Sequence, residues 1–188
     1  MPDIVENWTL ADGSDATLRP IRSSDMELER AFVRNLSPQS RFARFMGEVK
    51  ELSAQLLFDF THPDPKRESA YVVIRSTVSG EEEIGVARYV VDDAGESCEF
   101  AITVADAWQG KGVAARLMQV LIRDARARGL TRMDGFVLGT NQHMLAFVRK
   151  FGFVVEFGAQ DPTVRLVRLD LGGKLVGGTG IEPVTPAV

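Results

Sequence analysis

Residues 99–128, EFAITVADAWQGKGVAARLMQVLIRDARAR, decide how this chain folds. Apolar Phe100, Ile102 and Val104 alternate with Glu99, Ala101 and Thr103, which predicts a buried strand. Further along, apolar residues recur at helical spacing and predict an amphipathic helix; they are Val113, Leu117, Val120, Leu121 and Ala125. The arginines of this helix are expected to face water: Arg116, Arg123, Arg126 and Arg128. The stretch therefore reads as a strand, a loop and a helix.

The loop between them is Gln109-Gly110-Lys111-Gly112-Val113-Ala114. Its glycines let the backbone turn tightly and leave several N–H groups free at the start of a helix. Such a helix start binds anions, above all a pyrophosphate, and the helix dipole adds roughly 0.3–1 kcal/mol per anionic group. The loop is therefore predicted to hold phosphates.

One alternative is a dinucleotide-binding loop, because Gly110-x-Gly112-x-x-Ala115 formally matches the G-x-G-x-x-G/A pattern. The predicted strand ends near Val104, however, so Gly110 comes late for a tight strand-to-helix turn. No strand–helix alternation precedes the loop, and Asp134 falls early in the next strand rather than at its end. A purely structural glycine turn is the remaining alternative.

A second pattern in the loop, Gln109-x-x-Gly112-x-Ala114, resembles the Q/R-x-x-G-x-G/A pyrophosphate loop of the GNAT acyltransferase superfamily. Residues 141–153, from Asn141 to Phe153, resemble that family's Asn-initiated helix ending in Gly-Phe. Residues 17–22 (TLRPIR) and 36–45 (LSPQSRFARF) resemble the bacterial protein-lysine acetyltransferase (Pat-type) branch, whose domain is often fused to a synthetase-like or nucleotide-sensing module. The resemblance covers about residues 8–170.

The resemblance implies an α/β (α+β) fold: a single GNAT-like domain over residues 1–171. Its sheet is expected to be mixed and mostly antiparallel, with about six or seven strands flanked by helices and a splayed parallel pair at the cofactor site. The residues themselves predict an antiparallel meander of strands at 70–78, 84–91 and 99–104, followed by a strand at 131–138 parallel to the last of these. Residues 172–188 are Gly/Pro-rich and are expected to form a flexible tail.

The front of the chain predicts a hairpin across the turn residues 12–15. Helices are expected to begin at Ser24 or Asp25, at Ser37 and at Ser53, each of which can cap a helix. Three apolar side chains of the second of these helices are candidates for the core: Phe42, Phe45 and Met46, with Phe45 the strongest.

Composition narrows the function classes. A chain of 188 residues with 45% hydrophobic and 26% charged content suits one globular domain. A net charge of -4 gives no reason to expect nucleic-acid binding. The single cysteine excludes an internal disulfide and suits the cytoplasm. Neither a signal peptide nor a membrane span is visible.

Glu99 is the candidate general base. A lysine amine has a pKa of ~10.4, so its nucleophilic form costs about 4.6 kcal/mol to populate at pH 7. A carboxylate that accepts the amine proton typically contributes ~10²–10⁴ in rate. Glu99 points to the face opposite Phe100, one strand length before the loop. It also matches the position of the general-base glutamate in the lysine acetyltransferases that the chain resembles.

The cofactor implied by the resemblance is an acyl-CoA, above all acetyl-CoA as acyl donor. Its pyrophosphate is expected on the N–H groups of Gln109, Gly110, Lys111, Gly112, Val113 and Ala114. Its pantetheine arm is expected to pair with the backbone of Ile102, Thr103 and Val104 as an added strand, with donors left for the thioester carbonyl. Asn141 is expected to bind the arm or orient the thioester, to cap its helix, or to do both.

The sequence departs from the family at one catalytic position. Many relatives carry a tyrosine four residues before the Gly of Gly-Phe, where this chain has Val148, so the general acid stays unassigned. Cys98 alternates to the face opposite Glu99, which favours direct attack over a ping-pong route. His62 precedes a proline in a loop and is expected to be merely solvated. Two histidines and one cysteine without clustered spacing do not indicate a zinc site.

The leading hypothesis is a protein-lysine N-acetyltransferase whose acceptor could be an acyl-CoA synthetase, as in the resembled branch. The alternatives are a small-molecule amine or N-terminal acetyltransferase and a non-catalytic acyl-CoA-binding regulatory module. No membrane partner is expected, and the chain is expected to be a monomer or a homodimer.

Overall fold

The computed structural model describes residues 4–157 and 161–172. One sheet contains eight strands in the order β1-β2-β3-β4-β5-β6-β8-β7. Their bounds are β1 Glu6–Thr9, β2 Asp15–Pro20, β3 Glu68–Thr77, β4 Gly80–Val91, β5 Ser97–Val104, β6 Arg132–Leu138, β7 Val154–Phe157 and β8 Val164–Asp170. The helices are α1 Met26–Asn35, α2 Pro38–Phe45, α3 Ala54–Thr61, α4 Val113–Ala127 and α5 Gln142–Lys150, with 3₁₀ turns at Ser23–Asp25 and Asp106–Trp108.

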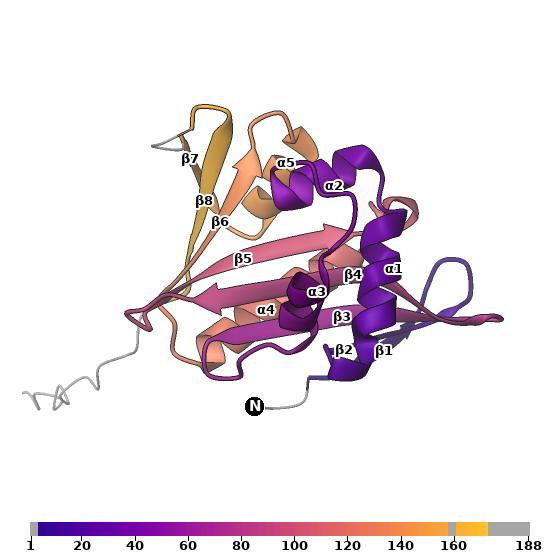
Figure 1. The fold of residues 1–188 in the computed structure, drawn as a ribbon. Coiled ribbons are helices and arrows are strands. Elements are labelled where there is room, and N and C mark those ends of the chain that lie inside the picture. The colour runs from indigo at the N-terminus through magenta and orange to yellow at the C-terminus, as the bar shows by residue number, and fades with distance from the viewer. Residues whose placement is uncertain (1–3, 158–160, 173–188) are drawn as a thin grey trace, which may run out of the picture.

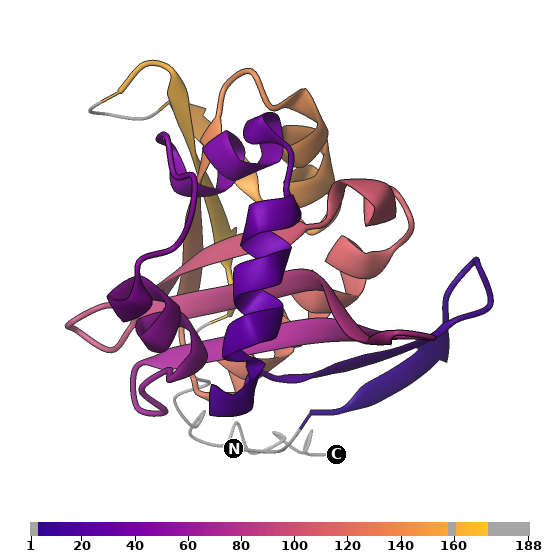
Figure 2. The ribbon, with the colours of Figure 1, turned by 45° about the vertical axis from the view of Figure 1, so that its right-hand side comes forward.

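The sheet is covered on both faces (Figure 1). Helices α1 and α3 lie on one face and bury a cluster that includes Phe32, Leu57 and Val72. Helices α4 and α5 lie on the other face, over a larger cluster that includes Leu117 and Val148. Figure 2 shows α1 running across the strands and the β1–β2 hairpin extending from one edge of the sheet. The domain is therefore a three-layer α/β/α arrangement.

Helix α4 is confirmed as the central helix of the larger core. All of the apolar residues predicted for its inner face are buried: Val113, Leu117, Val120, Leu121 and Ala125. The prediction that Arg128 faces water is wrong, because its guanidinium turns back onto the sheet. It donates to Ser69 Oγ at 2.7 Å and pairs with the buried Asp124 at 3.3 Å. Asp124 also accepts hydrogen bonds from Ser69 and the Tyr89 hydroxyl, so it fixes α4 to β3 and β4.

The predicted strand directions are confirmed. Strands β3, β4 and β5 pair antiparallel, and β5 pairs with β6 in parallel. The eight strands exceed the predicted six or seven because the β1–β2 hairpin and β7 continue the same sheet at its two edges.

The predicted caps are mostly confirmed. Ser37 Oγ accepts from Ser40 N at 3.2 Å, and Ser53 Oγ accepts from Leu56 N at 3.1 Å. Asp25 differs, because its carboxylate does not cap α1. It forms a buried, bidentate ion pair with Arg19, at 2.7 and 2.8 Å, and accepts from Arg22 N.

Two candidates for the core are wrong. Phe42 and Met46 are 46% and 38% exposed, whereas Phe45 packs against the smaller cluster. Met46 ends α2 with a left-handed φ of 50°, which turns the chain away from the core after the helix. The tail predicted for residues 172–188 lies outside the described residues except for Gly172. Within the described ranges, no helix is long and apolar enough to cross a membrane.

Candidate active site

Strands β5 and β6 pair along only part of their length. The parallel register joins Ser97 to Arg132, Cys98 to Met133 and Glu99 to Asp134, and then it stops. Beyond Glu99, β5 continues to Val104 while still paired with β4 on its other edge. No strand among the described residues pairs with the β6-facing edge of β5 over 100–104, so main-chain groups are open there. The expected splayed parallel pair is therefore present.

The divergence has a physical cause at Phe100. A Cβ built on Gly135 of β6 would come within 2.4 Å of the Phe100 ring, so the ring lies against a strand that has no side chain at that point. The same ring packs on Phe153, with 5.2 Å between centroids. An aromatic ring wedged at the position after the last paired residues keeps the two strands apart.

The loop after β5 provides free amides at the start of α4. Gly110 and Gly112 have left-handed φ values of 72° and 86°, which favour glycine. Within the described part of the chain, no oxygen accepts from the N–H groups of residues 110–115. The run of free N–H groups begins at Gly110, one residue later than predicted, because Gln109 N donates to Asp106 O at 3.4 Å. Several N–H groups at a helix start form a seat for a phosphate group.

A network of side chains fastens this loop to α2. Asp106 accepts from Ser37 N, Ser37 Oγ and Ser40 Oγ at 2.9, 2.8 and 2.7 Å. The Gln109 side chain donates to Ser40 Oγ and to Val104 O, both at 3.2 Å. Gln109 therefore positions the loop with its side chain. The sequence offers no local signal for this network, because Ser37 and Ser40 lie more than 60 residues from Asp106 and Gln109.

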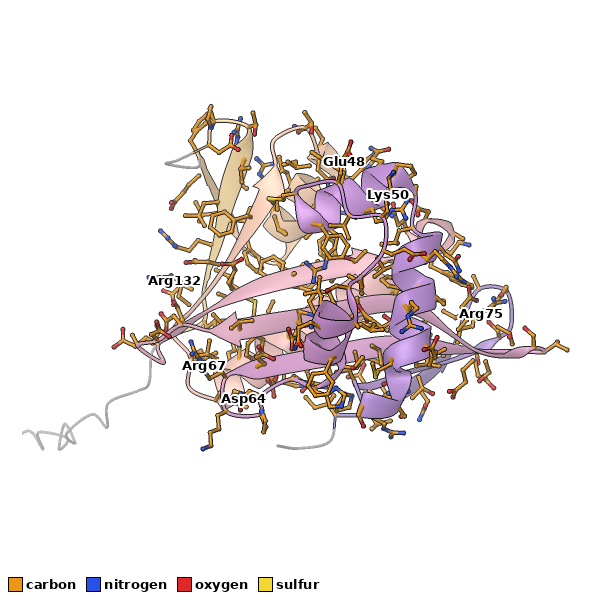
Figure 3. The ribbon with its side chains drawn as sticks, viewed as in Figure 1. Glu48, Lys50, Asp64, Arg67, Arg75 and Arg132 are labelled. Atoms are coloured by element: carbon orange, nitrogen blue, oxygen red, sulfur yellow. The ribbon has the colours of Figure 1, made fainter. Side chains whose placement is uncertain are left out.

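Trp108 packs against a cation of the loop, Lys111. It is buried between two cations, with Lys111 Nζ 4.7 Å and Arg75 Cζ 5.0 Å from its ring. Figure 3 shows Arg75 at the opposite end of the sheet from Arg132, which begins β6. The Lys111 ammonium is thus held beside the free amides, where it adds positive charge.

Glu99 lies at the last paired position of β5, where the open edge begins. Its side chain is exposed on the face that α1, α2 and α3 cover only in part. Partial burial, and after it the charge of Asp134 on the neighbouring strand, raise the pKa of Glu99 above its usual range. Asp134 itself is held by Arg132 and Arg168, each at 3.0 Å. A carboxylate with a raised pKa is a better proton acceptor for an amine.

The other predicted donor-binding residues lie around this edge. Ile102, Thr103 and Val104 form the unpaired part of β5, and the buried Thr103 hydroxyl has no hydrogen-bond partner within the described residues. Asn141 caps α5, since its Oδ1 accepts from Met144 N at 3.1 Å. The capping use leaves the Asn141 amide nitrogen free to donate.

Two other candidate groups, Val148 and Cys98, lie on the face of the sheet opposite Glu99, and His62 is engaged at the end of α3. Val148 is fully buried in the core beneath α5. Cys98 is buried on the opposite face of β5, and burial raises the pKa of its thiol to about 12, so the thiolate is disfavoured. His62 ends α3 and stacks on Phe58, with 3.9 Å between ring centroids.

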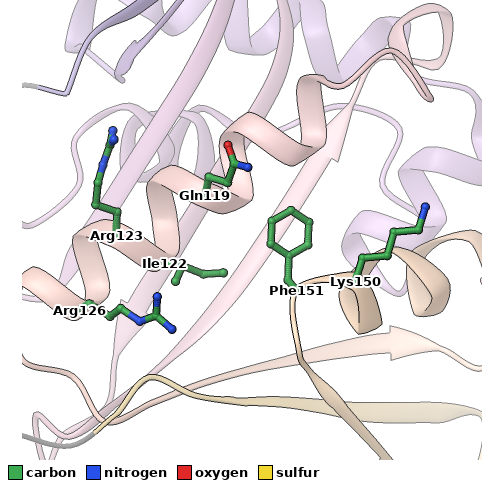
Figure 4. A pocket seen from close by; sticks show the side chains of 6 residues that line it. All are labelled: Gln119, Ile122, Arg123, Arg126, Lys150 and Phe151. Atoms are coloured by element: carbon green, nitrogen blue, oxygen red, sulfur yellow. The ribbon is translucent and has the colours of Figure 1, made fainter.

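A separate hollow lies between the outer sides of α4 and α5 (Figure 4). It measures about 500 Å³ and is lined by Gln119, Ile122, Arg123, Arg126, Lys150 and Phe151. Arg123 pairs with Glu6 at 2.9 Å, and Arg126 donates to Leu171 O at 3.2 Å. Cations near the ends of helices offset the helix dipoles, which accounts for their presence here.

The geometry around β5 therefore combines three features: an open main-chain edge, a phosphate-binding helix start and a carboxylate with a raised pKa. Such an arrangement can hold an extended molecule that ends in a diphosphate and place its other end beside a proton acceptor. The carboxylate lies where β5 leaves β6, the open edge runs from there along β5, and the helix start follows beyond the end of the strand.

Comparisons with known proteins give the family. Residues 32–153 match the model of the Acetyltransferase (GNAT) family. A Pseudomonas aeruginosa protein described as Acetyltransferase PA5475 is 36% identical over 168 residues, which cover 88% of this chain and 90% of that protein.

Solved structures of this family share the fold of this chain. The GNAT domain of S. lividans PAT superposes with a TM-score of 0.77 at 29% identity, covering 88% of this chain and 96% of that one. A GNAT acetyltransferase from Streptococcus pneumoniae shares the fold, with a TM-score of 0.68 at 19% identity and coverage of 84% and 99%. The chain therefore belongs to the GNAT family of acetyltransferases, which use acetyl-CoA as donor, and it is an acyl-CoA-dependent N-acyltransferase.

Proposed function

We propose that this enzyme transfers an acetyl group from acetyl-CoA to the side-chain amine of a protein lysine, with Glu99 as general base. The observation that carries the proposal is the place of Glu99: an exposed carboxylate of raised pKa at the point where the main-chain edge of β5 opens. The lysine acceptor rests on the resemblance of residues 17–22 and 36–45 to the Pat-type branch and on the 29% identity to the GNAT domain of S. lividans PAT.

The donor-binding residues act through their main chain. The N–H groups of residues 110–115 hold the diphosphate, and Lys111 adds a positive charge beside them. Residues 102–104 pair with the extended arm as an added strand, which places the reactive end near Glu99. Asn141 donates its free amide hydrogens to the same arm. Acetyl-CoA supplies an activated thioester, whose thiolate is a good leaving group even without an assigned acid.

Glu99 takes the proton from the acceptor ammonium, directly or through water, so that the free amine attacks the thioester carbon. Backbone donors on the open edge of β5 stabilise the negative charge that develops on the carbonyl oxygen. Direct attack agrees with Cys98, whose thiol is buried on the other face.

The decisive variant is Glu99→Gln, which keeps the shape of the side chain and removes its basicity. We expect kcat/KM for a lysine acceptor to fall by ~10²–10⁴, with acetyl-CoA affinity unchanged. Thiol release from acetyl-CoA and mass spectrometry of acetylated host proteins measure the reaction, and calorimetry measures donor binding. Glu96→Gln, in the exposed turn before β5, is the matched control and should keep the wild-type rate.

The proposal fails in distinct ways. Full activity of Glu99→Gln would show that Glu99 is not the general base. Acetylation of free small amines but of no host protein would leave the enzyme a small-molecule acetyltransferase. Tight donor binding with no transfer by the wild-type protein to any amine would favour a regulatory module. An acyl-CoA synthetase is the first acceptor to look for among the modified proteins.

A further inference from the structure

Two arginines on the same side of the sheet as Glu99 lack partners of opposite charge. Arg44 of α2 makes no hydrogen bond or ion pair within the described residues, and its contacts are the rings of Phe45 and Phe60, at 5.1 and 5.5 Å. Arg88 of β4 lies 4.0 Å over the same Phe60 ring. Its one hydrogen bond goes to Phe60 O at 3.2 Å, and its Nε is buried without an acceptor.

Burial disfavours the charged form of both guanidinium groups, and the charge of Arg88 adds to the effect at Arg44. Burial, and after it the charge of Arg88, lower the pKa of Arg44 to about 10, although Glu29 opposes the change. Burial also lowers the pKa of Arg88, opposed by Glu29, Glu83 and Glu68. Each cation is thus partly desolvated beside another cation, which is an unfavourable arrangement unless an anion is bound nearby.

The nearest acids do not fill this role. Glu29 of α1 and Glu83 of β4 are buried, and neither comes within 4 Å of Arg44 or Arg88. Burial and the neighbouring Glu29 raise the pKa of Glu83 well above its usual range, which weakens Glu83 as a counter-charge for the arginines. Arg44 and Arg88 are therefore left without an ion-pair partner within the described residues.

The register places these cations close to the reaction. Arg88 pairs with Ala101 and Val90 pairs with Glu99, so Arg88 and Glu99 share one face as diagonal neighbours, with Cβ atoms ~7–8 Å apart. The Arg44 side chain is only partly buried, and its unpartnered nitrogens are not among the fully buried polar atoms, so they reach solvent. A molecule that presents an amine to Glu99 therefore passes beside both arginines.

We infer that Arg44 and Arg88 bind a carboxylate on the acceptor, so that the enzyme selects lysines with a glutamate or aspartate next to them in the sequence. The inference rests on the proposed lysine acetyltransfer and names the acceptor class. The planar guanidinium fork matches a carboxylate and holds it with two parallel hydrogen bonds, which an isolated ammonium cannot do. The Phe45 and Phe60 rings stack on the guanidinium groups and hold their planes in place.

The test uses two peptides blocked at both termini, with one lysine flanked on both sides by Glu in one peptide and by Gln in the other. Binding to the CoA-loaded enzyme is followed by fluorescence anisotropy, and transfer by thiol release. We expect the wild-type enzyme to bind the Glu peptide about tenfold more tightly or better. Arg44→Gln should reduce this preference to within about twofold, and Arg44→Lys should give an intermediate value.

The matched control is Arg41→Gln, one turn earlier on α2, where the guanidinium donates to Lys50 O at 3.1 Å. It should keep the full preference. Acetyl-CoA affinity shows whether each variant is folded. Equal binding of the two peptides by the wild type, no binding of either, or a preference that persists in Arg44→Gln would overturn the carboxylate site. A preference in binding without any transfer would overturn the proposed reaction and leave the site standing.

Discussion

The loop after β5 and the layer of helices α1–α3 are built in different ways. The loop depends on main-chain geometry: two left-handed glycines, free N–H groups and a strand edge that stays open. The helical layer depends on side-chain contacts, such as the buried Arg19–Asp25 ion pair and the cations that come from different elements to the Phe60 ring. Donor binding should therefore tolerate most side-chain changes, while acceptor selection should respond to single substitutions.

The largest effect should come from the buried ion pair of the helical layer. Asp25→Ala leaves Arg19 buried without its partner and should lower the free energy of unfolding by ~3–5 kcal/mol, measured by urea denaturation. Glu27→Gln breaks an exposed ion pair with Arg30 on the same helix and should cost less than about 1 kcal/mol. Equal losses would mean that buried charges do not stabilise this layer. Acetyl-CoA affinity should be unchanged in both variants.

An intermediate effect is expected at the loop. Gly112→Ala puts a side chain on a residue with φ of 86°, which costs about 1–2 kcal/mol, and the strain should turn the N–H groups away from the diphosphate. We expect the Kd for acetyl-CoA to rise about tenfold, measured by calorimetry. Gly129→Ala, at a residue with φ of 76° after α4, introduces similar strain and should lower the stability without changing the Kd for acetyl-CoA. Unchanged donor affinity in Gly112→Ala would place the diphosphate elsewhere.

The smallest effect should be on pH dependence. The charge of Asp134 raises the pKa of Glu99 after the larger effect of partial burial, and a base must be deprotonated to act. Asp134→Asn removes that charge and leaves Arg132 and Arg168 nearby, so the acidic limb of the kcat/KM profile should move to lower pH. Arg149→Gln, on an exposed part of α5, should leave the limb in place. A limb that stays in place in Asp134→Asn would mean that Glu99 is not the titrating base.

The difference between main-chain geometry and side-chain contacts also explains which features could be predicted from the sequence. The strand, loop and helix of residues 99–128 are encoded locally, by alternation, glycines and helical spacing, and all three are present as predicted. Capping serines likewise give local signals, and Ser37 and Ser53 cap their helices. Glu99 and Asn141, which we propose as site residues, can be named from the resemblance, which orders motifs along the chain.

The features that could not be predicted depend on contacts that no local sequence pattern encodes. Arg128 fits a solvent-facing position by helical spacing, yet the buried Asp124 draws it onto β3. Phe42 lies on an amphipathic helix, but α2 is fixed by Asp106 at its start and leaves that ring exposed. The unpaired cations Arg44 and Arg88 come from different elements and meet only at the Phe60 ring. Such groupings are visible only once the chain is folded.

The contact of Phe100 with Gly135 has a consequence for turnover. Because the ring packs against Gly135 in the core, the open edge of β5, where we propose that the donor binds, is part of the folded protein before any substrate arrives. No remodelling of the sheet has to accompany each arrival of substrate or departure of spent CoA, so less binding energy is lost to ordering the site. The donor that we propose here would therefore meet a strand edge that is already open in the protein.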